Sequence, residues 1–280
     1  MGQLKVLKSL VIDSLDTITK GSMKYHIWMG FLTLVMLIGM YCYSIQLDEG
    51  LSVTGMSDRV SWGLYISNFT FLVGVAAAAV MLVMPTYVLK DIDFKQAVLI
   101  GEGLAVAALI MCLAFVVADM GGPSVLWHMI PGIGVFNFPN SMLTWDVIVL
   151  NGYLFINISI PFYILFRHYQ GKEAKQKVYV PGAVLSVFWA VGIHLVTAFL
   201  YQGLQARPFW NNALLGPRFL ASAFAAGPAL IILVLAVIRS FTAFKIEDKT
   251  IKKIAMIVTV AAQINLIMLV SELFKEFHPS

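Results

Sequence analysis

Long apolar segments alternate with short polar segments along almost the whole chain. Each apolar segment is near or above the about 20 residues that a membrane-spanning helix needs. The segments cover residues 25–47, 60–89, 97–118, 143–166, 178–201, 213–238 and 251–274. The pattern predicts an all-α polytopic membrane protein with about seven transmembrane helices.

Composition supports this prediction and limits the chemistry of the chain. Of its 280 residues, 60% are hydrophobic and 12% are charged, and the mean hydropathy is +0.85, which excludes a soluble globular domain. The two cysteines, Cys42 and Cys112, both lie inside predicted helices, so we expect no disulfide framework and no iron–sulfur cluster in this chain. Of the histidines only His194 lies deep in a predicted helix, so we expect no haem.

Basic residues gather on one side of the predicted topology. With a cytoplasmic N-terminus, fifteen of the nineteen lysines and arginines fall on the cytoplasmic side, and Arg59, Arg207, Arg218 and Lys275 fall outside. This distribution predicts a multi-pass protein of the cytoplasmic membrane and explains the basic balance without nucleic acid. The first 23 residues show no cleavage pattern, so we expect the first helix to be retained.

The chain resembles itself at an offset of 153 residues. The offset aligns small and aromatic residues of the second and sixth helices, namely Gly63, Phe71, Gly74 and Ala76 with Gly216, Phe224, Gly227 and Ala229. It also aligns Asp119 with Glu272, each near the outward end of its helix. We therefore expect parallel repeats of four-helix bundles. Residues 1–59 hold the N-terminus and first helix, 60–201 the first bundle, and 202–280 the start of an incomplete second bundle.

Polar residues collect at the outward ends of the first-bundle helices. Helical spacing places Ser61, Tyr65 and Asn68 on one face of the second helix, and Asp146, Tyr153 and Asn157 on one face of the fourth. His194 lies about 10 Å below the outward end of its helix, at the expected depth of Asn68. The stretch ADMGGPSVLWHM adds Asp119, Trp127 and His128 after the third helix, and Ser141 precedes the fourth.

Each of these residues also has a structural interpretation. A hydrogen bond to a neighbouring helix would account for Asn68, and the turn after the third helix would account for Asp119. The aromatic belt at the membrane surface would account for Trp127. Together, however, Asp119, His128, Ser141, Asp146 and His194 predict a site that binds a polar-headed apolar molecule and exchanges protons with it, as a quinone site must. Glu102 either extends to the inner surface or forms the inner end of a proton path through Asn157 and Tyr153.

Several ordered motifs resemble the NrfD/PsrC family of quinone-interacting membrane subunits, and within it the DsrP type associated with sulfite reduction. These motifs are SWGLYISNFTFLVG, ADMGGPSVLWHM, NSMLTWDVIVLNGY, GIHLVTAFLYQGL and LLGPRFLASAFAAGPAL. The resemblance implies an outward-facing menaquinone site in the first bundle. It implies as site residues Trp62, Asn68, Asp119, Trp127, His128, Ser141, Trp145 and Asp146. Two departures are Gly122, where many relatives have arginine, and GVAAAA, where some have histidine.

The resemblance also implies partners. These are a ferredoxin-like periplasmic iron–sulfur subunit of the DsrO type, a haem b membrane subunit, a multihaem cytochrome c and a cytoplasmic iron–sulfur subunit. We interpret the chain as a subunit that exchanges electrons between menaquinone or menaquinol and the periplasmic partner. Its own proton-handling and ligand residues are Asp119, His194 and Asp146, with Trp62, Tyr65, Asn68, Trp127, His128 and Ser141. The alternatives are a proton channel or secondary transporter built on the repeat, and a passive membrane anchor of the complex.

Overall fold

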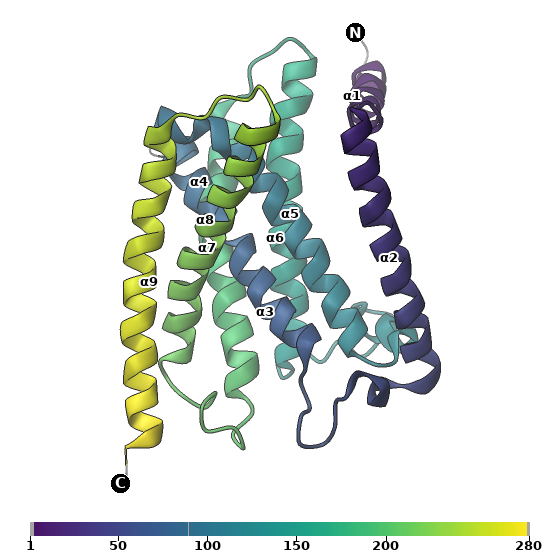
Figure 1. Cartoon of the computed structure of the whole chain (residues 1–280), viewed down its shortest axis with the longest axis vertical. Helices are drawn as coiled ribbons and strands as arrows, with labels where there is room; N and C mark the ends of the chain where they lie inside the picture. The colour runs from purple at the N-terminus through teal and green to yellow at the C-terminus, as the bar shows by residue number, and fades with distance from the viewer. Residues whose placement is uncertain (1–2, 89, 279–280) are drawn as a thin grey trace.

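The computed structural model describes residues 3–88 and 90–278, and these residues form a helical bundle (Figure 1). The long helices are α2 (Met23–Glu49), α5 (Lys95–Asp119), α6 (Met142–Tyr169), α7 (Gln176–Gln202), α8 (Leu215–Phe241) and α9 (Asp248–Phe277). The shorter ones are α1 (Gln3–Thr19), α3 (Leu64–Ala76), α4 (Ala78–Val83) and the short turns η1 (Leu51–Thr54), η2 (Met84–Val88), η3 (Ile92–Phe94) and η4 (Pro123–Met129). The predicted all-α class is confirmed.

The structure contains seven helical spans that are long and apolar enough to cross a membrane, with α3, α4 and part of η2 forming one of them. Because the number of spans is odd, the two ends of the chain lie at opposite faces of the bundle (Figure 1). We call the face at which α1 precedes α2 the proximal face. The opposite face, at which α2, α5, α7 and α9 end, is the distal face.

The second span differs from the predicted continuous helix over 60–89. Its helix begins only at Leu64, because the backbone of Gly63 (φ −112°, ψ −143°) lies outside the helical region, so Ser61 and Trp62 precede the helix instead of lying on its face. The span is interrupted again between α3 and α4 and continues as the π-helical turn η2, which contains Pro85. Proline has no backbone N–H to donate, and such π turns are a common site of helix distortion. The amphipathic helix α1 was not predicted.

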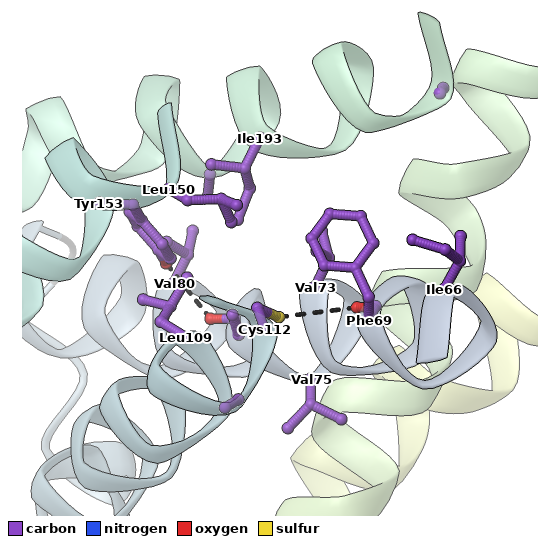
Figure 2. Close-up of a cluster of buried hydrophobic side chains, with 14 of the residues drawn as sticks. Ile66, Phe69, Val73, Val75, Val80, Leu109, Cys112, Leu150, Tyr153 and Ile193 are labelled. Carbon is purple, nitrogen blue, oxygen red and sulfur yellow. Dashed lines mark hydrogen bonds between the residues drawn. The ribbon is translucent and has the colours of Figure 1, made fainter. Parts of the chain in front are cut away.

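Helix α3 lies at the centre of the bundle and packs against α5 and α8 (Figure 1). At Gly74 the α3 backbone approaches α8 so closely that an added Cβ would lie 3.6 Å from the Cα of Ala223. Around α3, apolar side chains from α5, α6 and α7 form the main core, which includes Phe69, Leu109, Leu150 and Ile193 (Figure 2). Small residues at helix crossings are typical of membrane bundles, where close backbone approach replaces the hydrophobic effect as the source of helix association.

Helix α2 stands apart from this bundle for most of its length (Figure 1). Of its 27 residues only Gln46, one turn from the distal end, is buried. The exposed side chains of α2 are almost all apolar, as expected for a surface in contact with lipid. The helix is thus joined to the bundle near its distal end.

At the proximal face, the segment before α5 is fastened to the start of α9 by charge pairs. Lys253 Nζ lies 2.7 Å from an Asp93 carboxylate oxygen and also pairs with Asp91, and Lys249 Nζ lies 2.9 Å from Asp93. Thr250 adds a hydrogen bond from its hydroxyl to the Asp93 carbonyl, 2.6 Å long. The ammonium groups of Lys253 and Lys249 hold the pKa of Asp93, and Lys253 holds that of Asp91, below the usual aspartate range.

This pairing predicts an acid-sensitive contribution to stability. A carboxyl group with a lowered pKa in the folded state stabilises fully above the usual aspartate pKa of about 4 and loses that contribution as the pH falls through the folded-state value. The double variant Asp91→Asn/Asp93→Asn should therefore unfold at a lower temperature than the parent near neutral pH, and the difference should shrink on acidification. Thermal unfolding in detergent between about pH 2 and pH 6 measures it. A constant difference over this range would contradict the assignment, and Asp58→Asn on an exposed loop is the control.

The contact between α6 and α7 predicts a local steric limit. A Cβ at Gly152 would overlap the indole ring of Trp189, whose Nε1 donates to the Val149 carbonyl at 2.8 Å. We expect Gly152→Ala to displace the ring and to lower the free energy of unfolding by about 1–3 kcal/mol. Gly192→Ala on α7 is the matched control, because its Cβ would meet no other atom within 4 Å. Equal unfolding temperatures for the two variants would show that the indole moves without cost.

Candidate functional site

Three polar side chains from three helices meet near the distal face, and we call them the distal cluster: Gln46 of α2, Tyr65 of α3 and Asp119 of α5. The Gln46 Nε2 donates to the carbonyl of Ala118, 2.8 Å away, next to Asp119. The Tyr65 hydroxyl donates to Gln46 Oε1 at 2.6 Å. The Asp119 Oδ1 is buried and has no hydrogen-bond partner among the described residues. The cluster thus holds a buried carboxyl oxygen without a hydrogen-bond partner among the described residues.

A second group, the central cluster, lies deeper and consists of Asp146 of α6 with Thr197 and His194 of α7. Thr197 donates to Asp146 Oδ1 at 3.1 Å, while Asp146 Oδ2 is buried without a partner in the described structure. His194 Nδ1 contacts the carbonyl of Ala190 in its own helix. Its buried Nε2 has no partner of good hydrogen-bond geometry among the described residues, and the backbone of Val73 in α3 lies close to the imidazole. Asp146 and His194 are each 2% exposed. Both are therefore core residues, yet each keeps one unsatisfied polar atom, which is costly inside a membrane protein.

Aromatic and hydroxyl groups connect the two clusters. Tyr201, one turn distal to Thr197, shares a hydrogen bond with the Thr70 hydroxyl of α3. Trp62 packs edge-on against Tyr201 at 5.0 Å between ring centroids and stacks on Trp210 at 5.6 Å. The Tyr201 hydroxyl is close enough to Asp119 and Asp146 to interact electrostatically with both. Tyr201 therefore lies within electrostatic range of an acid from each cluster.

The other predicted site residues lie elsewhere. His128 stacks on Trp127 at 3.8 Å in η4, and both are exposed on the distal surface, where Trp127 is 48% exposed. Ser141 precedes α6 without capping it through its side chain, and Asn68 bonds to the Leu64 carbonyl of its own helix. Within the described ranges, no side-chain hydrogen bond joins these four residues to either cluster.

Glu102 does not extend to the proximal surface. It is 2% exposed, and its Oε2 is buried without a partner among the described residues. Tyr87, which stacks edge-on with Tyr179 of α7, lies beside it. The nearby Tyr153 of α6 donates to the Ala76 carbonyl at 3.4 Å, as Figure 2 shows. Glu102 is thus a buried acid on the proximal side of the same core.

Sequence reasoning missed Gln46, Thr197 and Thr70. Gln46 is a single polar residue near the end of an apolar helix, a position typical of an interfacial residue. Thr197 and Thr70 are small polar residues that often bond to their own helix. One signal was present for Thr197: it is three residues after His194 and four before Tyr201, so the three share a face of α7.

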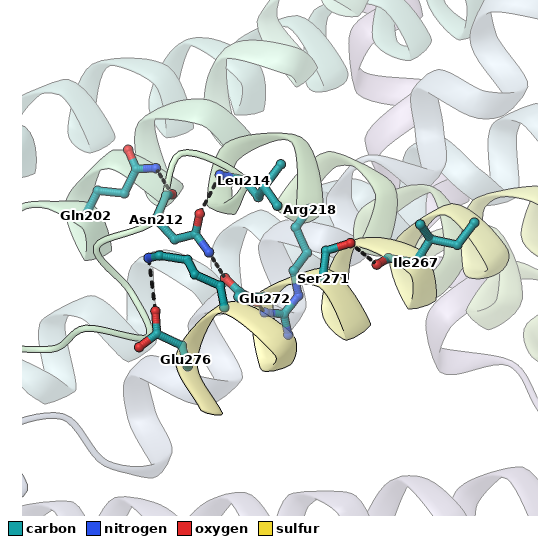
Figure 3. Close-up of polar contacts among 9 residues, drawn as sticks. Gln202, Asn212, Leu214, Arg218, Ile267, Ser271, Glu272 and Glu276 are labelled. Carbon is teal, nitrogen blue, oxygen red and sulfur yellow. Dashed lines mark hydrogen bonds and ion pairs between the residues drawn. The ribbon is translucent and has the colours of Figure 1, made fainter. Parts of the chain in front are cut away.

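In the second unit of the predicted repeat, the buried acid has hydrogen-bonding and ionic partners. Glu272 of α9, at the position that the 153-residue offset assigns to Asp119, is fully buried and forms an ion pair with Arg218 of α8. Asn212 Nδ2 donates to the other oxygen of Glu272 at 3.2 Å (Figure 3). The same offset places Arg218 opposite Tyr65. The carboxylate of the second unit is therefore satisfied, whereas that of the first is open.

The groups in the two clusters suit a quinone better than a metal ion. Within residues 3–88 and 90–278, no group of three or more His, Cys, Asp or Glu side chains is arranged to hold a metal. Asp119, Asp146 and His194 each offer a buried polar atom without a partner, and carboxyl and imidazole groups accept and release protons. Trp62 and Tyr201 add aromatic surface for a planar ring. A separate groove of 550 Å³ between α8 and α9 is lined by apolar side chains, such as Phe224 and Ile264, that bind no quinone oxygen.

Comparison with known proteins gives consistent matches. One similar protein is the Hdr-like menaquinol oxidoreductase integral membrane subunit of Archaeoglobus fulgidus, 27% identical over 84% of this chain and 56% of its own. Another is a putative membrane subunit of a dimethyl sulfoxide reductase from Halobacterium salinarum, 24% identical over 84% of this chain and 55% of its own. A third is a subunit of the selenate reductase from Mesobacillus selenatarsenatis, 23% identical over 89% of this chain and 64% of its own.

The chain therefore spans little more than half the length of the first two of these relatives. The family model described as "Polysulphide reductase, NrfD" matches residues 52–278, which is most of the chain and includes every helix from α3 to α9. With its seven apolar spans, the chain is a multi-pass integral membrane protein that belongs to the polysulphide reductase NrfD family.

Proposed function

We propose that this chain is the quinone-interacting membrane subunit of a respiratory redox complex. The observation that carries the proposal is the set of buried, unpartnered atoms in the distal and central clusters: Asp119 Oδ1, Asp146 Oδ2 and His194 Nε2. Keeping such atoms unsatisfied costs stability, so they are best explained by a ligand or by proton exchange. Names of similar proteins, which include a menaquinol oxidoreductase membrane subunit, support menaquinone as the ligand.

In this proposal the residues of the chain bind, orient and move protons. A bound quinone supplies a two-electron, two-proton couple, and the redox centres of partner subunits take or give the electrons. Asp119 binds a ligand hydroxyl and exchanges its proton with water at the distal surface. Asp146, held by Thr197, and His194 accept or supply the second proton, with Tyr201 within electrostatic range of Asp146 and Asp119. The contacting rings of Trp62 and Tyr201 offer an aromatic surface beside which the quinone ring packs in this proposal.

We also propose an orientation of the chain in the membrane and a set of partner subunits. The distal face is periplasmic and the N-terminus cytoplasmic in the cytoplasmic membrane, as the basic residues favour. A ferredoxin-like iron–sulfur subunit of the DsrO type docks on the distal face. The proposed complex also contains a haem b subunit, a multihaem cytochrome c and a cytoplasmic iron–sulfur subunit, linked to sulfite metabolism as in the DsrP type. Trp127 and His128, exposed on the distal surface, contact the distal partner in this arrangement.

Binding of a menaquinone analogue to the purified protein tests the proposal. Replacing Asp119 by Asn removes the ionisable group and keeps the size, so the affinity should fall about tenfold or more, the equivalent of one hydrogen bond to a charged group at about 1.5–3 kcal/mol. Asp58→Asn, which neutralises an exposed acid of the distal loop, should leave the affinity unchanged. Quenching of tryptophan fluorescence measures binding without partner subunits.

The alternatives give other results. A proton channel or transporter would move protons across liposome membranes without a quinone, through Glu102 and the buried acids of the core. A passive anchor would bind the analogue weakly or not at all, and Asp119→Asn would change nothing. Either result, with the fold of the variant checked by thermal unfolding, would rule out the distal cluster as a quinone site.

A further inference from the structure

We propose that Gln46 makes the distal cluster selective for the reduced, hydroxyl-bearing form of its ligand by holding the Tyr65 hydroxyl proton. This inference rests on the proposed function and concerns a residue outside the part of the chain that the family model matches, which begins at residue 52. It treats Gln46 as a positioning residue that acts through Tyr65. It starts from the directions of two hydrogen bonds.

The orientation of the Gln46 amide is fixed by its partner. A backbone carbonyl can only accept, so the atom of Gln46 that contacts the Ala118 oxygen at 2.8 Å must be the nitrogen. The amide oxygen then points to the Tyr65 hydroxyl, 2.6 Å away. Because an amide oxygen has no hydrogen, Tyr65 must be the donor in this bond. The Gln46 amide oxygen thus accepts the one hydrogen bond that the Tyr65 hydroxyl can donate.

The bond to Gln46 limits the hydrogen bonds that the Tyr65 hydroxyl can make to a ligand. With its proton used, the Tyr65 oxygen can only accept a hydrogen bond from a further molecule. The second hydrogen of the Gln46 nitrogen belongs to a side chain that is 2% exposed, so it is not accessible to a ligand. The Asp119 carboxyl group adds an acceptor oxygen, Oδ1, that has no partner among the described residues. The distal cluster therefore presents acceptors to its ligand.

Acceptors distinguish the two redox forms of a quinone. The carbonyl oxygens of the oxidised form have no hydrogen to donate, whereas the hydroxyl groups of the reduced form do. One hydrogen bond changes an affinity by up to about tenfold, so the reduced form should bind up to about tenfold more tightly. Such a tenfold preference raises the midpoint potential of the bound two-electron couple by about 30 mV.

The placement of Gln46 agrees with this role. It is the buried residue of α2, a helix whose other side chains are largely exposed, and its two bonds reach α3 and α5 together. In the second repeat unit the position equivalent to Tyr65 is Arg218, whose guanidinium satisfies Glu272 directly. The first unit instead combines a phenol with a glutamine from outside the repeat, and its carboxylate stays open.

The ratio of the dissociation constants for the oxidised and reduced forms tests the inference. We would titrate the purified protein with a short-tailed menaquinone analogue and with its hydroquinone under anaerobic conditions, and confirm the ratio by redox titration of the bound analogue. The parent should favour the hydroquinone. Gln46→Leu releases the Tyr65 hydroxyl to donate, so the ratio should fall to about one or invert, with tighter binding of the oxidised form. Gln46→Glu should keep the ratio, because a carboxyl group accepts from Tyr65 in either protonation state.

A control separates this role from mere attachment of α2. Gln202→Leu removes a comparable bond, 2.7 Å to the Asn212 carbonyl, in the second unit and should leave the ratio unchanged. If Gln46→Leu weakens both forms by one common factor, Gln46 only anchors the helix and the inference is wrong. Equal binding of both forms by the parent also overturns it, while the proposed function survives. Binding of neither form overturns the proposed function itself.

Discussion

The hydrocarbon core of a membrane offers no hydrogen-bond partners, and the placement of almost every polar side chain in this chain follows from that constraint. Most hydroxyl and amide groups in the spans bond to their own helix, as Ser186 and Asn157 do. Glu272 obtains a complete set of partners from Arg218 and Asn212. Against this background, the buried atoms without a partner among the described residues are exceptions. They belong to Asp119, Asp146 and His194 in the two clusters, and to Tyr43, Thr86, Glu102 and Asn265 elsewhere.

The predicted repeat relates the helix pair α3 and α5 to the pair α8 and α9, and each pair carries an acid near the distal face. Helix α5 packs against α3 as α9 packs against α8, and the offset that aligns Asp119 with Glu272 also aligns the first residues of α5 and α9, Lys95 and Asp248. The second span is interrupted between α3 and α4 whereas α8 is continuous, and the side chains near the distal ends of the two pairs also differ. A guanidinium neutralises the acid in one unit. In the other, the Tyr65 hydroxyl donates to the Gln46 amide, and Asp119 Oδ1 has no partner among the described residues.

The sequence predicted the seven spans well, because a bilayer requires about 20 apolar residues per crossing and leaves little freedom in their length. It did not predict the interruptions of the second span, whose backbone is determined by tertiary packing around Pro85 and Gly63. The sequence singled out Asp146 and His194 as candidate site residues because ionisable groups are rare inside membrane spans. Trp127 and His128 were expected beside Asp119 because they follow it in sequence and because the family resemblance implied them, and the structure places them on the surface. Gln46 was missed because its partners, Tyr65 and Ala118, are distant in sequence.

The isolation of α2 has a consequence for how the helix is held in place. Most of its length faces lipid and adds little packing, so its position is set at its two ends. At the distal end Gln46 bonds to Ala118 and Tyr65, and at the proximal end α1, which precedes α2, packs against α6. Helix α2 is therefore a strut that is fixed at both ends and in contact with lipid along its middle.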